Sequence, residues 1–250
     1  MDARLAVVIM AAGKGTRMNN PAMAKVMYMI DGRPLVDWVV DRASALEAAR
    51  TVAIVGWQKE DVIAHLAGVA PHVACVEQTP QLGTGHAVMQ AEPALRGFAG
   101  DVLVLSGDVP MLTTVTARRL IESHRGSNAV ATVLTAVLED PTGYGRILRD
   151  GNGAVTGIIE HKDATEEQRS IREINSGIYV FDASALFDGL RHLTPDNVQK
   201  EYYLTDVVRH LTRNGRRVAA LAADDPEEVA GINTPAQLEA ARRVLTGRGS

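Results

Sequence analysis

Almost wholly apolar runs alternate along the chain with segments whose apolar residues recur every three or four positions. Residues 5–12 and 101–106 are of the first kind, which is typical of strands buried on both faces of a sheet. Residues 34–49 are of the second kind and begin with a proline suited to a first helical turn. This alternation predicts an α/β, Rossmann-like fold, a mostly parallel sheet with helices on both faces.

The second half of the chain has a different pattern, with several strands separated by only short helical pieces, which predicts a mixed extension of the sheet. The predicted strands are residues 5–12, 51–55, 73–76, 101–106, 129–137, 145–149, 154–160, 173–181 and 217–222. The predicted helices are residues 34–49, 60–66, 85–95, 114–124, 184–190, 203–213 and 235–245.

Composition narrows the class of protein. The 250 residues are 46% hydrophobic and 22% charged, as expected for one folded domain over residues 1–245 with a flexible polar tail at 246–250. A net charge of −4 without a basic run argues against nucleic-acid binding. The single cysteine, Cys75, excludes a disulfide within the chain and fits a reducing cytoplasm. Because residues 5–12 are too short for a signal-peptide core with its cleavage site or for a membrane span, we expect a cytoplasmic protein that does not bind membranes.

The loop after the first predicted strand reads Ala-Ala-Gly-Lys-Gly-Thr-Arg-Met over residues 11–18. Glycines at such a place let backbone N–H groups approach a phosphate, and Lys14, Arg17 and Lys25 supply positive charge. The loop lacks the Walker spacing and the third glycine of the dinucleotide fingerprint. Two interpretations without a ligand remain open. The glycines could serve only to turn the chain, and the cations could belong to a solvated loop.

Asp108 follows the predicted strand at 101–106, at the sheet edge where open α/β folds bind ligands. A carboxylate there either caps a helix or turn or holds a cation. The seven histidines show no spacing typical of a zinc site.

Seven further segments follow the glycine loop in a fixed order. They are residues 78 with 81–87, then 106–110, 143–147, 159–163, 174–177, 201–206 and 231–233. Together with the loop, they resemble nucleotide-diphospho-sugar pyrophosphorylases, most closely the uridylyltransferase domain of bacterial bifunctional N-acetylglucosamine-1-phosphate uridylyltransferase/acetyltransferases. The resemblance runs from residue 5 to about residue 245.

The resemblance implies transfer of a uridylyl group from UTP to N-acetylglucosamine 1-phosphate with Mg²⁺ as cofactor, the nucleotide-binding part covering residues 1–127 and the sugar-binding part residues 128–233. It implies catalytic roles for Arg17 and Lys25 and metal ligation by Asp108 and Asn233. The implied nucleotide-binding residues are Met10, Ala11, Ala12, Gly13, Gly15, Gln78, Gly83, Thr84 and Ser106. The implied sugar-binding residues are Gly145, Glu160 and Asn175.

For several of these residues a simpler interpretation remains. Thr84 is also suited to capping a helix, Asn233 to a turn, and Glu160 to the polar end of a strand. The tyrosines within residues 201–206 fit core packing as well as a sugar pocket.

The chain departs from the family pattern in two ways. Ala24 stands where the family has proline, in a segment one residue longer than usual in which Pro21 is expected to stiffen the loop. No acetyltransferase β-helix domain or hexapeptide repeat is recognisable, so we expect a standalone enzyme or a truncated one.

Three other functions remain as alternatives. A nucleotidyltransferase for another sugar 1-phosphate or another nucleotide would differ by only a few hydrogen bonds. A binding protein that senses sugar nucleotides would not need Arg17, Lys25 and Asp108, which are all present. A Rossmann oxidoreductase is disfavoured by the missing third glycine. The sequence does not define the oligomeric state.

Overall fold

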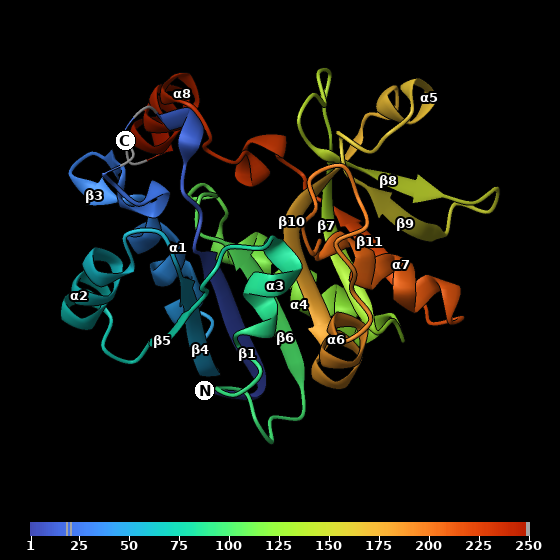
Figure 1. The fold of residues 1–250 in the computed structure, drawn as a ribbon, viewed down its shortest axis with the longest axis horizontal. Coiled ribbons are helices and arrows are strands. Elements are labelled where there is room, and N and C mark those ends of the chain that lie inside the picture. The colour runs from blue at the N-terminus through green and yellow to red at the C-terminus, as the bar shows by residue number, and fades with distance from the viewer. Residues whose placement is uncertain (19, 21, 249–250) are drawn as a thin grey trace.

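The computed structural model describes residues 1–18, 20 and 22–248. The first apolar run forms β1 (Asp2–Ala11), the strand about which the parallel part of the sheet is arranged (Figure 1). It pairs in parallel with β4 (Ala48–Val55) on one side and with β6 (Asp101–Ser106) on the other, and β5 (Ala74–Glu77) pairs in parallel beyond β4. The predicted parallel arrangement is therefore confirmed.

The second half of the chain adds the mixed extension. β10 (Glu173–Asp182) lies antiparallel between β6 and β7 (Ala131–Val137), and β11 (Val218–Ala222) pairs in parallel with β7 at the edge. β8 (Gly145–Arg149) pairs with one end of β10 and with β9 (Val155–Ile159). Among the described residues, nine strands thus form one sheet in the order β11-β7-β10-β6-β1-β4-β5, with β8 and β9 branching from β10.

Helices cover both faces of this sheet, as predicted. Alternate residues of β1 show the division, because Val7 and Ile9 belong to one apolar core and Ala6 and Val8 to another. The first core is closed by α1 (Leu35–Ser44), α2 (Lys59–Val69) and α4 (Thr114–Gly126). The second is closed by α3 (Thr84–Met89), α6 (Ala183–Leu190) and α7 (Thr205–Arg213).

A third, smaller core lies beside the glycine loop. The hairpin β2 (Met29–Ile30) and β3 (Arg33–Pro34), which the sequence pattern did not predict, packs there with α8 (Pro235–Arg248). Figure 1 shows α8 and the β8–β9 pair on opposite sides of the upper edge of the sheet, the latter beside α5 (Glu166–Arg169). The remaining elements are 3₁₀ helices at Thr16–Met18, Lys25–Met27 and Pro226–Val229.

Several element ends differ from the prediction, among them the carboxyl-terminal ends of three helices. α1 ends at Ser44 rather than at 49, because a turn with Glu47 at φ +53° leads directly into β4. α3 ends at Met89 rather than at 95, consistent with Pro93, which has no N–H to continue the helical ladder. α8 continues through residues 246–248 of the expected flexible tail, and 249 and 250 lie outside the described residues.

No helix in the described part of the chain combines the length and the apolar character needed to cross a bilayer.

Candidate functional site

A cavity of about 480 Å³ opens at the carboxyl ends of β1 and β6. The sequence predicted the polar site residues at this edge of the sheet. Met10, the penultimate residue of β1, is the cross-strand partner of Ser106, the last residue of β6. The predicted site residues that line the cavity are Met10, Ala12, Gly13, Gly15, Lys25, Gln78, Gly83, Thr84, Ser106 and Asp108. Ala11 is buried within β1, so only its backbone can take part in binding.

The glycine loop has a backbone that requires glycine at one position. Gly15 has φ +62°, and a Cβ atom there would lie 2.9 Å from the Cβ atom of Lys25. A side chain at Gly15 would therefore be strained and would displace Lys25. The loop tightens at once afterwards, since the Met18 N–H donates to the Gly15 carbonyl at 2.8 Å.

Four charged or polar side chains from three distant segments converge beside this loop. Lys25 Nζ donates to Asp108 Oδ2 and, at 2.7 Å, to Asn233 Oδ1. Arg17 Nη2 donates to the same Asn233 oxygen at 2.9 Å. The structure therefore brings together all four residues expected to act in catalysis and metal binding, although Arg17 and Asn233 lie beside the cavity rather than in its lining.

The segment carrying Asn233 is fixed to the turn carrying Asp108. The Ile232 N–H donates to the Asp108 carbonyl at 2.9 Å, and the Asn233 N–H donates to Gln237 Oε1 at 2.8 Å. The Asn233 side-chain oxygen is thus directed at Lys25 and Arg17, so Asn233 is more than a turn residue. Ala24, in an extended conformation, leads into the 3₁₀ helix that begins at Lys25, whereas Pro21 lies outside the described residues.

Asp108 Oδ2 and Asn233 Oδ1 both contact one ammonium nitrogen, so they converge on a single cationic position. Carboxylate and amide oxygens are the donors preferred by Mg²⁺, which takes few protein ligands and completes its shell with water and phosphate. The two residues therefore fit a magnesium ion.

On the other side of the cavity, Gln78 is almost wholly buried and is held by its neighbours. Its Nε2 atom donates to the Gly83 carbonyl at 2.9 Å and lies 3.1 Å from His86 Nδ1. The Thr84 hydroxyl oxygen accepts from the Leu204 N–H at 3.0 Å and makes no capping bond to α3. The simpler interpretation of Thr84 as a helix cap is therefore wrong, because this hydroxyl ties α3 to the segment preceding α7.

The expected sugar-binding residues form a second group, at the junction of β8, β9 and β10. Gly145 and Asn175 are cross-strand partners, and Asn175 Oδ1 accepts from the Gly177 N–H at 3.1 Å. The Ser106 hydroxyl donates to the Gly177 carbonyl at 3.4 Å, which links this group to the end of β6. None of the three expected sugar residues is among those lining the 480 Å³ cavity.

Glu160 follows β9 and accepts a hydrogen bond on Oε1 from the Thr205 hydroxyl at 3.0 Å. Burial raises the pKa of this carboxyl, and the nearby carboxylates of Asp163, Asp206 and Glu201 add to the effect. Glu160 is thus held close to the start of α7, in a position where ionisation is costly.

Six residues of the cavity lining were not among the expected catalytic, binding or metal residues: Lys14, Thr16, Val26, Gln81, Ala87 and Glu201. Lys14 was noted only as a loop cation, and its ammonium lies 5.1 Å from the centre of the Trp57 ring. Gln81 and Glu201 occur in segments that the sequence had already marked, so those segments were a usable signal. Val26 and Ala87 are apolar residues without a chemical signature.

A larger hollow, of about 780 Å³, lies at the opposite edge of the sheet, near the first residue of β6. It contains none of the expected site residues. Two of its lining residues, Glu92 and Arg191, form an ion pair at 2.5 Å. The convergent cations and oxygens are at the smaller cavity, which is therefore the candidate functional site.

Comparison with known proteins agrees with this geometry. The family model described as nucleotidyl transferase matches residues 6–226. The chain is 48% identical over 244 residues to the bifunctional protein GlmU of Pelobacter propionicus, an alignment covering 98% of this chain and 53% of that protein. Proteins of the same name from Cutibacterium acnes and Streptomyces coelicolor are 49% and 50% identical, over 97% of this chain and 60% and 51% of their own lengths.

The chain thus spans about half the length of the curated relatives it matches. The family model covers far more than half of the chain, from β1 to the 3₁₀ helix that precedes Asn233. The chain therefore belongs to the nucleotidyl transferase family.

Proposed function

We propose that this chain is a uridylyltransferase that joins UTP and N-acetylglucosamine 1-phosphate to give UDP-N-acetylglucosamine and pyrophosphate. The observation that carries the proposal is the convergence of Lys25, Arg17, Asp108 and Asn233 beside the glycine loop. Two cations next to two oxygen donors suit a site that binds both phosphate and a divalent metal. The identity of the base and of the sugar in this proposal comes from the family resemblance of the surrounding segments.

In the proposed reaction, a phosphate oxygen of the sugar 1-phosphate attacks the α-phosphorus of UTP. A new phosphorus–oxygen bond forms as the bond from the α-phosphorus to the bridging oxygen breaks, and pyrophosphate leaves with that electron pair. Catalysis then rests on positioning and charge neutralisation rather than on a protein nucleophile. Lys25 and Arg17, which both contact Asn233 Oδ1, are placed to stabilise the charge on the reacting phosphates.

Asp108 and Asn233 would hold Mg²⁺, which neutralises phosphate charge when it is bound. The Lys25 ammonium contacts both of these oxygens. Lys25 is therefore placed to contact a phosphate at the position where the metal ion would bind.

We assign Gln78, Gly83 and Thr84 to the uracil, because a side-chain amide can match the donor and acceptors on one edge of that base. Gly145, Glu160 and Asn175 are assigned to N-acetylglucosamine. We further propose that residues 1–127 form the nucleotide-binding part and residues 128–233 the sugar-binding part of one domain. A polar glutamate next to the Thr205 hydroxyl offers directional hydrogen bonds of the kind that sugar hydroxyl and acetamido groups need.

The proposed partners are small molecules rather than nucleic acid or membrane, and we propose the cytoplasm as the compartment. The only cysteine, Cys75, is half-buried, and burial raises the pKa of its thiol. A thiol of this kind is poorly reactive, as suits a protein without disulfides in a reducing compartment.

The experiment that tests the function is a pyrophosphate-release assay with the purified chain, Mg²⁺, UTP and N-acetylglucosamine 1-phosphate. Glucose 1-phosphate and the other nucleoside triphosphates serve as parallel substrates. Rapid release with UTP and N-acetylglucosamine 1-phosphate alone is the expected result. Release with a different pair would keep the reaction but assign another sugar phosphate or nucleotide as the substrate. No release with any pair would overturn the proposal of catalysis.

A further inference from the structure

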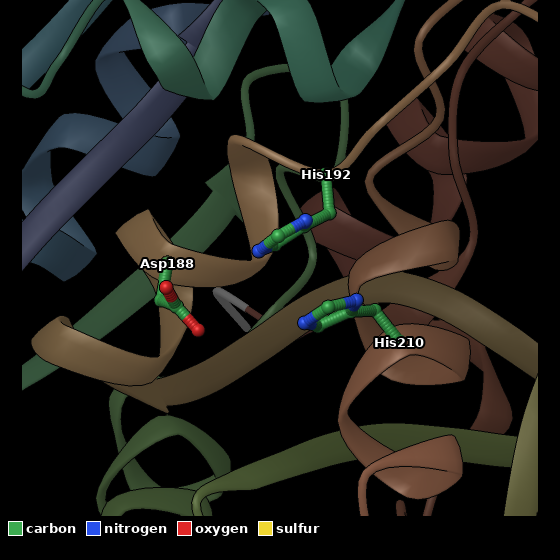
Figure 2. Close-up of side chains that lie close together, drawn as sticks. All are labelled: Asp188, His192 and His210. Atoms are coloured by element: carbon green, nitrogen blue, oxygen red, sulfur yellow. The ribbon is translucent and has the colours of Figure 1, made fainter.

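Asp188, His192 and His210 come together on the outside of the second apolar core, where α6 meets α7. One ligand atom from each residue lies within 4.8 Å of the others. Figure 2 shows the two imidazole rings stacked, with a nitrogen of each ring turned toward the side on which Asp188 lies. The rings are 4.4 Å apart between centroids and 12° from parallel. Because the lone pair of an imidazole nitrogen lies in the ring plane, a shared ion requires one ring to rotate about its Cβ–Cγ bond, which the exposed His192 has room to do.

This arrangement follows from the packing of the two helices. Asp188 is in the last turn of α6, and His192 lies one helical turn further along the chain. Gly189 permits the close approach of α7, because a Cβ atom there would lie 2.8 Å from Val207 Cγ1. The helices also share buried apolar side chains, so the backbones that carry the three residues are held firmly.

The donor set is that of a borderline divalent cation. Two imidazoles and a carboxylate are common ligands of Zn²⁺, with water completing a tetrahedral shell, whereas Mg²⁺ prefers oxygen donors alone. Asp188 and His192 are exposed and His210 is half-buried, so an ion can reach them from solvent. The competing contact is an Asn214 amide 3.3 Å from His210 Nε2, and the same amide donates at 2.8 Å to the His210 carbonyl, which a metal would leave intact.

A second cluster of metal-type side chains, Asp101, His124 and Asp182, is less suited to a metal. Arg125 donates to Asp101 at 2.6 Å, so a cation already occupies this carboxylate. His124 is buried, and its Nδ1 atom lies 3.0 Å from the Thr132 hydroxyl. Among the described residues, by contrast, no lysine or arginine side chain forms an ion pair with the Asp188 carboxylate.

We propose that Asp188, His192 and His210 bind one Zn²⁺ ion, which joins the end of α6 to α7. The ion would close the two ends of the segment 193–204, which connects these helices. That segment reaches the candidate active site, since the Tyr202 N–H donates to the Leu82 carbonyl at 2.8 Å and its carbonyl accepts from the Gly85 N–H at 2.7 Å. Zinc at this site therefore stabilises the wall that Glu201 contributes to the cavity.

The proposal is tested by titrating Zn²⁺ into the full chain, first freed of metal by a chelator, in competition with a chromophoric zinc indicator. We expect one Zn²⁺ per chain, and a loss of affinity of at least about tenfold in each of His192→Ala and His210→Ala. His72→Ala is the matched control, because His72 is also exposed and contacts a side chain, the Ser44 hydroxyl at 2.9 Å. It should bind zinc like the unchanged protein.

Two further measurements separate this site from the active site and from a loss of folding. Asp108→Asn should retain the same zinc affinity, since Asp108 belongs to the other cavity. Zinc should raise the melting temperature and slow amide hydrogen exchange over residues 193–204 in the unchanged protein but not in His210→Ala, whose melting temperature without zinc should match. Equal zinc binding by the unchanged protein and both histidine variants, or no binding by any of them, would overturn the proposal.

Discussion

Lys25 Nζ lies 2.7 Å from Asn233 Oδ1, although 208 residues separate them in the chain. The contact exists because the loop after β1 and the segment before α8 meet at the same edge of the sheet, where Ile232 is hydrogen-bonded to the carbonyl of Asp108. Asp108 receives the second hydrogen bond of the same ammonium. Lys25 thus contacts both proposed metal ligands, Asp108 and Asn233. Replacing it is therefore the most direct test of the proposed chemistry.

Lys25→Ala should lower kcat by roughly 10²–10³, as expected for the loss of one donor to a charged transition state. The measurement is steady-state pyrophosphate release together with the melting temperature, which should show an intact fold. Lys59→Ala is a matched control, because Lys59 is paired with Glu77 outside the cavity. Near-normal turnover of Lys25→Ala would remove Lys25 from the mechanism.

Arg17→Ala should lower kcat by a similar factor of roughly 10²–10³, since it removes the other cation beside Asn233. Arg17 is exposed and belongs to none of the three apolar cores, so its loss should leave the melting temperature unchanged. Arg17→Lys separates charge from geometry, and a partial recovery of kcat is expected because lysine keeps the charge but not the planar fork. Full activity in Arg17→Ala would contradict the assignment.

Asp108→Asn should raise the Mg²⁺ concentration needed for half-maximal activity by more than about tenfold, because the metal would lose its only charged protein ligand among the proposed pair. The readout is initial rate against Mg²⁺ at saturating substrates, supported by direct Mg²⁺ titration calorimetry with UTP present. Asp61→Asn, on the exposed side of α2, is the control and should behave like the unchanged protein. An unaltered Mg²⁺ requirement in Asp108→Asn would argue for different metal ligands.

Gly15→Ala should destabilise the fold by about 1–2 kcal/mol and lower kcat, because a Cβ atom at φ +62° is strained and would press on the Cβ atom of Lys25. Gly13→Ala is the contrasting variant for stability, since a Cβ atom there would meet nothing within 4 Å and Gly13 has no positive φ. Urea unfolding of both variants measures the difference. Equal stability of the two would show that the loop backbone relaxes without cost.

The strands were predictable from sequence because the sheet is covered on both faces, which makes each central strand a nearly continuous apolar run. β6 and β8 have the predicted bounds, and the other predicted strands differ only at their ends. Helix ends were less predictable, because they depend on local events such as Pro93 after α3 or the left-handed Glu47 after α1. The β2–β3 hairpin has strands of only two residues, too short to show a period.

Some residues of the candidate site could be predicted from local sequence signals, and others could not. Glycine spacing and the position of Asp108 after a strand indicate phosphate and metal chemistry from the residues alone. Asn233 carries no local signal, and only the family resemblance linked it to Asp108 before the structure showed their shared contact with Lys25. The pairing of His192 with His210 was not predictable, since it depends on how α6 and α7 pack through Gly189.

Glu160 provides a pH-dependent test of the sugar side of the site. In the unfolded chain its carboxyl ionises near its ordinary value of 4.5, whereas burial raises its pKa in the folded protein. Between those two pKa values the folded state binds more protons than the unfolded state, so the free energy of unfolding falls as pH rises through this window. Each unit of pKa difference corresponds to about 1.4 kcal/mol.

Glu160→Gln removes this ionisation while keeping an oxygen that can accept from the Thr205 hydroxyl. The variant should therefore be more stable than the unchanged protein at pH 8, and the difference should shrink toward pH 4, where Glu160 is mostly protonated in both states. Urea unfolding across this pH range measures it, with Glu122→Gln on the exposed face of α4 as a control that should show no such trend. A stability difference for Glu160→Gln that does not change with pH would mean that burial does not hold this carboxyl in its neutral form. If Glu160 also binds the sugar, the same variant should raise the KM for the sugar 1-phosphate more than the KM for UTP, because the altered carboxyl lies on the β8–β9 side of the site and away from the glycine loop.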